Sequence, residues 1–210
     1  SGSKLIILRN FDEEGKIVPS TDRQRLNNLA NQEWHSDSSF KKIPSKMSIL
    51  SAKIIPSLGG NTEFLSMRAS YNALPHDLKL KIDDKVCWHD YSHGRSKIDP
   101  NLVTPEEKQA LPPVKQKLVL GNNKHGKSLY LGAHCRNVDG MSDNDSKDLL
   151  AEINSYIDHE KFVYSHVWEP YDLIMWDNRA VLHRATPVKG KIEKRLMVRT
   201  TIAGVSSTLN

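Results

Sequence analysis

The sequence predicts a mainly β protein, a β-sandwich or jelly roll that carries a helical insert. Segments rich in strand-forming residues lie in the first and last thirds of the chain, and helical patterns lie between them. The two kinds of element do not alternate regularly, as they would in a parallel α/β sheet. The 210-residue chain has no internal repeat and no clear linker, so we expect residues 1–210 to form a single domain.

The predicted strands are short and widely spaced. The clearest, residues 46–55, is β-rich and partly alternating, stops at Pro56 and is followed by a turn at Gly59-Gly60. The remaining strands are predicted at residues 62–65, 128–131, 162–168, 172–176, 180–183 and 195–203.

Three helices are predicted between these strands. Thr104-Pro105-Glu106-Glu107 combines an N-cap, a proline at the first helical position and a capping-box glutamate. A second helix, which Ser142 or Asp145 could cap, has apolar residues at helical spacing: Leu149, Leu150, Ile153, Tyr156 and Ile157. A third is suggested by the spacing of Met67, Tyr71 and Leu74.

Composition argues against several classes of protein. The net charge of +5 comes from 30 basic and 25 acidic residues. They are interspersed, whereas a nucleic-acid-binding protein more often concentrates Lys and Arg in one stripe. No apolar run approaches the roughly 20 residues of a membrane span, and no secretory signal precedes the charged opening segment.

The cysteine content and the charge also indicate a setting and a partner. Cys87 and Cys135 are too few for a disulfide framework, so we expect a reduced, cytoplasmic protein. The mild positive excess is compatible with a small anionic molecule as partner but decides little by itself. We expect neither nucleic acid nor a membrane as partner, because the charges are interspersed and no apolar run is long enough to span a bilayer. A homo-oligomer is compatible with the sequence but is not indicated by it.

Trp34-His35-Ser36-Asp37 contains the only His-x-Asp of a chain with nine histidines. On an extended strand, residues i and i+2 point to the same face with their Cα atoms about 7 Å apart. The His35 imidazole and the Asp37 carboxylate could therefore converge on one metal ion. Taken alone, such a motif is more often a hydrogen-bonded or surface pair.

A second segment adds a third potential ligand. Residues 175–183 run from an apolar strand through a polar turn into another apolar strand, and His183 lies near the end of the latter. Two histidines and one carboxylate on one face leave other coordination sites open, as in the facial triad of non-haem Fe(II) oxygenases. A single histidine at a strand end is usually structural, so the interest of His183 depends on its pairing with His35 and Asp37.

The segment from Lys194 to Thr200 carries two arginines on one face of a predicted strand. Arg195, Met197 and Arg199 alternate with Leu196 and Val198. Two inward guanidinium groups would be costly unless each met an anion, and the planar guanidinium suits carboxylates. An exposed edge with the arginines outward and Leu196 and Val198 inward is an equally good reading of this segment alone.

Together these residues resemble the TauD/TfdA family of Fe(II)/2-oxoglutarate-dependent dioxygenases. The resemblance lies in the metal-binding segment 31–40, in Gly59-Gly60-Asn61-Thr62-Glu63-Phe64, in residues 175–183 and in residues 195–204. It covers nearly the whole chain from about Asn10. It implies a double-stranded β-helix, the jelly roll of cupin-like proteins, with the helical insert and with the iron at one mouth.

The resemblance also implies a role for each site residue. His35, Asp37 and His183 would bind Fe(II), and Thr62 and Arg195 would hold the distal carboxylate of 2-oxoglutarate. Arg199 would lie near the bound anions and contact the acidic group of the substrate. The reaction would use O2, release succinate and CO2, and hydroxylate a small organic acid such as the aryloxyacetate 2,4-dichlorophenoxyacetate.

Two departures from the family pattern accompany this resemblance. The interval from His183 to Arg195 is one residue longer, so the loop 186–193 is expected to differ. The family also begins many residues earlier, so we expect part of its N-terminal region, which contributes to the substrate pocket, to be missing from these 210 residues.

Other interpretations remain open. Cys87-Trp88-His89 with His93 could suggest zinc, but no further Cys or His pair completes a four-ligand set. His134-Cys135 is expected to serve packing or to line a pocket. The alternative functions are a related dioxygenase acting on a sulfonate such as taurine, a non-catalytic cupin-like metal-binding protein, and a hydrolase that uses the same triad.

Overall fold

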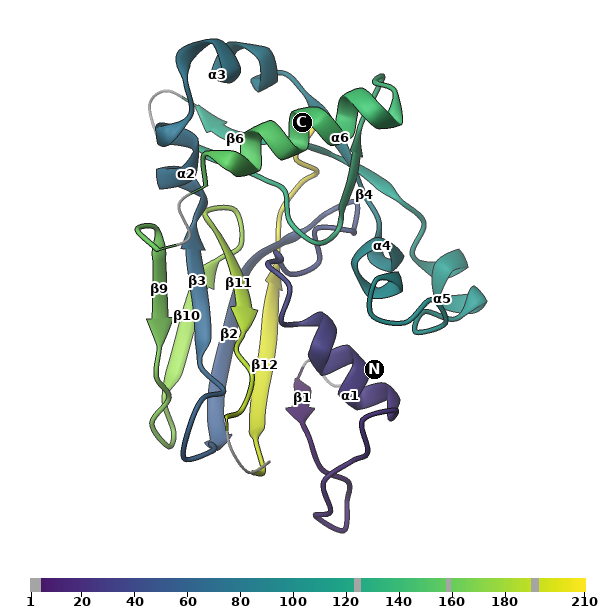
Figure 1. Ribbon diagram of the computed structural model, residues 1–210, viewed down its shortest axis with the longest axis vertical. Coiled ribbons are helices and arrows are strands. Elements are labelled where there is room, and N and C mark those ends of the chain that lie inside the picture. Colours follow the sequence, from purple (N-terminus) through teal and green to yellow (C-terminus); the bar gives the residue numbers. More distant parts are fainter. Residues whose placement is uncertain (1–4, 123–125, 158–159, 190–192) are drawn as a thin grey trace.

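The computed structural model describes residues 5–122, 126–157, 160–189 and 193–210. Its main body consists of two antiparallel sheets whose strands run side by side (Figure 1). The four-stranded sheet has the order β1 (Ile6–Arg9), β12 (Leu196–Ala203), β2 (Ser45–Ile54) and β10 (Leu173–Asp177). The three-stranded sheet has the order β11 (Val181–Ala185), β3 (Thr62–Ser66) and β9 (Val163–His166).

A small apolar core joins the two sheets. It contains residues from β2, β3, β10 and β12, together with a tryptophan that follows β9: Leu50, Ala52, Phe64, Trp168, Trp176 and Met197. On β2 the buried Ser48, Leu50 and Ala52 alternate with partly or fully exposed residues, the period-2 pattern of a strand with one face in the core. The predicted mainly β sandwich is confirmed.

The segment between β3 and β9 is the helical insert. Helices α2, α3 and α6 lie beyond one end of the sheets, and α4 and α5 lie beside them (Figure 1). The insert comprises α2 (Met67–Ala73), α3 (His76–Ile82), β4 (Val86–His89), α4 (Tyr91–Ser96), α5 (Pro105–Ala110), β5 (Val114–Lys117), β6 (Val119–Asn122), β7 (Gly126–Leu129), β8 (Cys135–Val138) and α6 (Asp143–Ser155). Its larger apolar core continues onto the sandwich through Leu65 of β3 and Leu182 of β11.

The predicted helix starts are confirmed in detail. Thr104 and Glu107 form a reciprocal capping box at α5, with Pro105 at its first position. Of the two candidate caps for α6, Ser142 is the one used, because its hydroxyl accepts a hydrogen bond from the Asp145 amide. Helix α1 (Arg23–Ala30), which Asp22 caps, was not predicted because its apolar residues are too few to show a clear period.

Several strand boundaries differ from the prediction. The strand expected at 128–131 is β7, which begins at Gly126 because it forms a hairpin with β6. The strand expected at 162–168 ends at His166, before the Glu169-Pro170 turn. The loop 186–193, expected to differ from the family, contains residues 190–192, which lie outside the described part of the chain.

The register of β12 decides which face its arginines occupy. Met197 pairs with Ala52 and Arg199 pairs with Leu50, both on the buried face of β2. Met197 is fully buried, so Met197 and Arg199 point into the sandwich, as one of the two readings of this segment predicted. Arg195, which precedes β12, lines the same cavity as Arg199. Within the described residues, no helix combines the length and the apolar character that crossing a membrane requires.

Candidate active site

Two distant segments meet at the site through a pair of backbone hydrogen bonds. The His35 amide donates to the His183 carbonyl at 3.1 Å, and the His183 amide donates to the His35 carbonyl at 2.9 Å. His183 lies on β11, but His35 forms only this isolated bridge, and Asp37 lies in the turn that follows. His35 and Asp37 therefore do not share an extended strand, the geometry considered for the His-x-Asp motif, although the two side chains do converge.

His35, Asp37 and His183 form a buried cluster that could hold a metal ion. One ligand atom from each residue lies within 4.8 Å of the other two. The Nε2 atoms of His35 and His183 lie 3.9 and 3.8 Å from the two oxygens of Asp37. These distances are too long for hydrogen bonds, so the three groups face a common space rather than one another.

The protonation states suit metal binding. The Nδ1 atom of His35 lies 2.7 Å from the Glu33 carbonyl, which can only accept, so Nδ1 carries the proton and Nε2 presents its lone pair. Burial lowers the pKa of His35 and of His183, which keeps both imidazoles neutral. Two neutral imidazoles and a carboxylate are the donor set of a non-haem Fe(II) site, and the residues fit that ion.

The Asp37 carboxylate is held ionised despite its burial. Burial alone would raise its pKa, but the interactions with His183, Arg199 and His35 outweigh this and lower the pKa to about 2. Arg199 is the partner that is always charged, and its guanidinium donates to Asp37 Oδ1 at 2.6 Å.

Asn178 and Ser48 orient the same carboxylate. The Ser48 hydroxyl donates to Asp37 Oδ2 at 2.6 Å and accepts from the Asn178 amide nitrogen at 2.8 Å. The Asn178 side-chain oxygen in turn accepts from the Asp37 amide at 3.2 Å and from Trp176 Nε1 at 3.0 Å. Because all four residues are buried, this network leaves the carboxylate little freedom to rotate.

A cavity of about 380 Å³ opens on one side of the triad. Thr62 and Arg195, the residues expected to bind 2-oxoglutarate, both line it with His35 and His183. Trp168 donates to the Thr62 hydroxyl at 3.0 Å, and Arg195 Nε donates to the Gly60 carbonyl at 3.2 Å. Burial lowers the pKa of Arg195 to about 10, which still leaves it charged at neutral pH.

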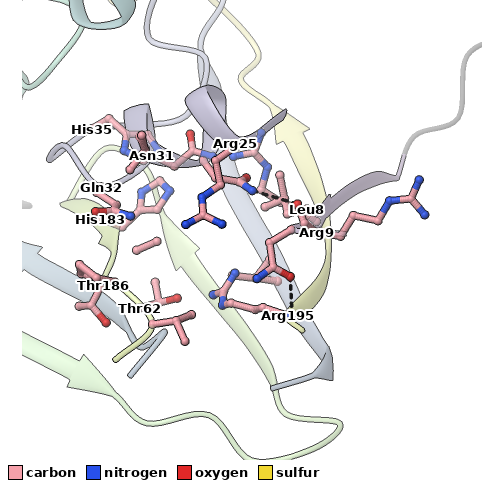
Figure 2. A pocket seen from close by; sticks show the side chains of 18 residues that line it. Leu8, Arg9, Arg25, Asn31, Gln32, His35, Thr62, His183, Thr186 and Arg195 are labelled. Atoms are coloured by element: carbon pink, nitrogen blue, oxygen red, sulfur yellow. Dashed lines mark hydrogen bonds between the residues drawn. The ribbon is translucent and has the colours of Figure 1, made fainter. Parts of the chain in front are cut away.

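Figure 2 shows how the charged groups of this cavity lie. The Arg25 and Arg195 side chains extend into the space that the imidazoles of His35 and His183 also border, and Thr62 lies beside Arg195. Among the described residues, the lining contains arginines at positions 9, 25, 195 and 199 and no acidic residue. Such a cavity attracts an anion with more than one negative group.

A second cavity of about 340 Å³ lies against the other side of the triad. It shares Asn31, His35 and Arg199 with the first cavity, and Asp37 also borders it. Its remaining lining is largely aromatic or apolar with two further cations: Ile6, Ala30, Ser38, Phe40, Lys41, Tyr91, Gly94, Arg95, Leu111, Ala133 and His134. The triad therefore separates a cavity lined by several arginines from one lined mainly by aromatic and apolar residues.

The structure decides between the other sequence interpretations. Among the described residues, the triad is the only group of three or more His, Cys, Asp or Glu side chains arranged to hold a metal ion, so the Cys87-Trp88-His89 segment is not a zinc site. Cys87 and Cys135 are both free and buried. His134 was expected either to serve packing or to line a pocket, and it lines the second cavity.

Sequence reasoning missed several residues of the site. Arg25 lies on α1 and Arg95 on α4, two helices that were not predicted, so nothing indicated that they face the triad. Ser48 could have been found, because its alternation with Leu50 and Ala52 places it on the buried face of β2. Asn178 lies in the polar turn expected within residues 175–183, and the sequence pattern alone gave it no further role.

A β-sandwich with two histidines and one carboxylate at its mouth, between an anion-attracting cavity and a second pocket, has the design of a non-haem iron oxygenase. The comparison with known proteins gives the family. The family model for the taurine catabolism dioxygenase TauD, TfdA family matches residues 8–201. The chain belongs to this TauD/TfdA family of 2-oxoglutarate-dependent dioxygenases.

Similar proteins support this assignment across most of the chain. The sequence is 37% identical over 201 residues to the alpha-ketoglutarate-dependent 2,4-dichlorophenoxyacetate dioxygenase of Cupriavidus pinatubonensis, a match that covers 95% of this chain and 70% of that protein. It is 28% identical to the (S)-phenoxypropionate/alpha-ketoglutarate-dioxygenase of Sphingobium herbicidovorans, covering 96% of this chain and 73% of that protein.

A solved structure resembles the fold closely. The crystal structure of AAD-2 in complex with Mn(II) and N-oxalylglycine matches with a TM-score of 0.89 and 41% identity, covering 97% of this chain and 75% of that one. The predicted jelly roll is confirmed by this likeness. The predicted requirement for Fe(II), 2-oxoglutarate and O2 is that of the family.

Proposed function

We propose that this dioxygenase hydroxylates a small aryloxy carboxylic acid, with 2,4-dichlorophenoxyacetate as the type of substrate. The observation that carries the proposal is the pair of cavities on either side of the triad, one lined by arginines and one by aromatic residues and arginines. The first would hold 2-oxoglutarate and the second the primary substrate. Relatives that act on 2,4-dichlorophenoxyacetate and on (S)-phenoxypropionate support this substrate class.

In this proposal His35, Asp37 and His183 hold Fe(II), and Thr62 and Arg195 hold the distal carboxylate of 2-oxoglutarate. Arg195 can offer a planar pair of donors, and its fixed Nε contact with Gly60 limits how the side chain turns. The bound iron supplies the activation of O2 that oxidises a substrate C–H bond while 2-oxoglutarate is converted to succinate and CO2.

The protein contributes position, charge and exclusion of water. Asn178 and Ser48 fix the carboxylate of Asp37, and burial of the three ligands keeps bulk water away from them. Arg199 borders both cavities, and we propose that it contacts the acidic group of the substrate as well as Asp37.

The test is succinate release by the iron-loaded protein over a panel of phenoxyacetates, phenoxypropionates, sulfonates and quaternary-ammonium acids. We expect stimulation by the aryloxy acids, with a phenol and glyoxylate formed together from a phenoxyacetate, because hydroxylation beside the ether oxygen gives an unstable hemiacetal. If only sulfonates stimulate succinate release, the substrate class is sulfonates rather than aryloxy carboxylic acids. Stimulation only by uncharged or cationic compounds would overturn the proposal.

A further inference from the structure

Arg95 lines the second cavity, and its guanidinium has no acidic partner among the described residues. Within the described residues no carboxylate lies at ion-pair distance from it, whereas Arg23, Arg179, Arg184 and Arg199 all have one. Burial lowers the pKa of Arg95, so its charge has lost part of its hydration. A half-buried, unpaired guanidinium beside an open cavity is a strong site for an anion.

Two neighbours fix the orientation of the Arg95 side chain. Its guanidinium carbon lies 4.0 Å from the centroid of the Tyr91 ring, one turn earlier on α4. Its Nε donates to the Asn27 side-chain oxygen on α1 at 3.3 Å. These contacts use the face and the Nε of the guanidinium, and they leave its two terminal nitrogens available for a ligand.

The charge balance of the cavity also favours an anion. Of the described residues that line it, Lys41, Arg95 and Arg199 are the cations and Asp37 is the only acidic residue. Arg199 is already bonded to Asp37 at 2.6 Å, and a metal ion on the triad would add further positive charge. An anionic ligand at Arg95 would offset this excess without competing for Asp37.

The walls of the cavity suit an aromatic ring. Phe40 makes edge contacts with Tyr91, at 4.7 Å between ring centroids, and with His134, at 4.8 Å. Pairwise contacts connect these rings to Arg95 through Tyr91 and to the triad residue His35 through His134, whose ring centroid is 6.2 Å from that of His35. Aromatic pairs of this kind accommodate a further ring in edge or offset contact.

We propose that Arg95 binds the carboxylate of the aryloxy acid substrate and thereby selects acids over neutral aryl ethers. Arg95 is a substrate-binding residue that a motif search does not reveal, because it lies on a short helix of the insert. This inference rests on the proposed function, and it adds to Arg199 a second cation that recognises the charge of the substrate.

The test measures binding without turnover. The protein loaded with Mn(II) and N-oxalylglycine is titrated calorimetrically with phenoxyacetate and with phenoxyethanol, which differ in the carboxylate. We expect the wild-type protein to prefer phenoxyacetate by about tenfold or more, the usual value of a charge-assisted hydrogen bond. Arg95→Gln should lower this preference at least severalfold, to what Arg199 alone provides, and Arg95→Lys should restore only part of it because a point charge lacks the planar pair of donors.

Two controls separate recognition from structure. Arg136→Gln removes the same charge from an exposed side chain near the N-cap of α4 and should leave the preference unchanged. The affinity of Arg95→Gln for N-oxalylglycine should stay within about twofold of the wild type. If Arg95→Gln does not fold, Arg95→Lys serves as the test, and we expect it to weaken the binding of phenoxyacetate more than the binding of phenoxyethanol.

Several outcomes would overturn this role. One is an Arg95→Gln variant that still prefers phenoxyacetate over phenoxyethanol as strongly as the wild type does. Another is an equal loss of affinity for both compounds, which would mark Arg95 as structural. Absence of any preference in the wild type would also refute it. Failure of the proposed function is a different result, namely no succinate release with any aryloxy acid, and it is read from turnover rather than from the charge preference.

Discussion

The Asp37 carboxylate depends on residues that lie far from it in the sequence. Its two oxygens receive bonds from Arg199 on β12 and Ser48 on β2, and Asn178 holds both Ser48 and the Asp37 amide. The His-x-Asp motif predicted which residues meet a metal, but it could not predict what holds the carboxylate in place. That information is in the register of β2, which needs the folded sheet.

We expect Asp37→Ala to abolish substrate-dependent succinate formation, because the variant loses the only carboxylate of the triad. Iron content should fall at the same time, and metal analysis of the purified protein would measure it. Asp148→Ala is the matched control, since Asp148 is exposed on α6 and is not among the residues that line either cavity. Wild-type activity with a full iron content in Asp37→Ala would refute the assignment.

We expect Arg195→Ala to raise the KM for 2-oxoglutarate by roughly 10- to 100-fold, since a charge-assisted contact contributes about 1.5–3 kcal/mol. Arg195→Lys should recover only part of this loss. The KM for the primary substrate should change far less, because Arg195 lines only the first cavity. An unchanged KM for 2-oxoglutarate in both variants would transfer the role to another arginine of that cavity, such as Arg25.

The strands of the sandwich were predictable because their period is short and their composition is distinctive. β2, β3, β10, β11 and β12 were all expected within a few residues of where they lie. Elements of four to eight residues with weak periodicity were not predicted. The strands β1, β4, β5, β6 and β8 are short, and the helices α1, α3 and α4 lack a clear apolar stripe. Arg25 and Arg95 were missed for this reason.

Ser48→Ala tests how far a strand supports the metal centre. The substitution removes the hydrogen bond to Asp37 and leaves the Asn178 amide without its partner. We expect the affinity for the metal to fall roughly 10- to 100-fold, as it does when residues that orient metal ligands are lost. Mn(II) titration measures this effect.

Ser51→Ala on the same strand is the control, because Ser51 lies on the opposite face of β2 and is only partly buried. Its affinity for Mn(II) should match the wild type. An equal loss in both variants would indicate a general weakening of the sheet, and no loss in Ser48→Ala would show that Arg199 alone suffices to hold Asp37.

The stability of the whole molecule should depend on pH through His89. This residue is fully buried in the insert, its ring stacks on Tyr130 at 5.4 Å, and burial lowers its pKa to about 4. Because the folded pKa lies below the unfolded value of 6.5, the unfolded chain takes up the proton first. Stability is therefore complete above pH 6.5 and is lost as the pH falls towards 4.

A shift of this size corresponds to about 3 kcal/mol of unfolding free energy. Urea unfolding of the wild type and of His89→Phe at pH 7 and at pH 4.5 measures this contribution. Between these two pH values, the fall in the free energy of unfolding should be smaller in His89→Phe than in the wild type by on the order of 2–3 kcal/mol. Equal losses would assign the acid sensitivity to other buried histidines, His134 among them.

The backbone bridge between His35 and His183 has a consequence for biosynthesis. During translation, His35 and Asp37 leave the ribosome long before His183 is made, and Arg199 follows later still. A metal held by these three side chains cannot be captured by the nascent chain with its full ligand set. Iron insertion thus belongs to the end of synthesis, when the last strands have closed the sandwich, and a ribosome-arrested chain ending before β11 should bind no iron.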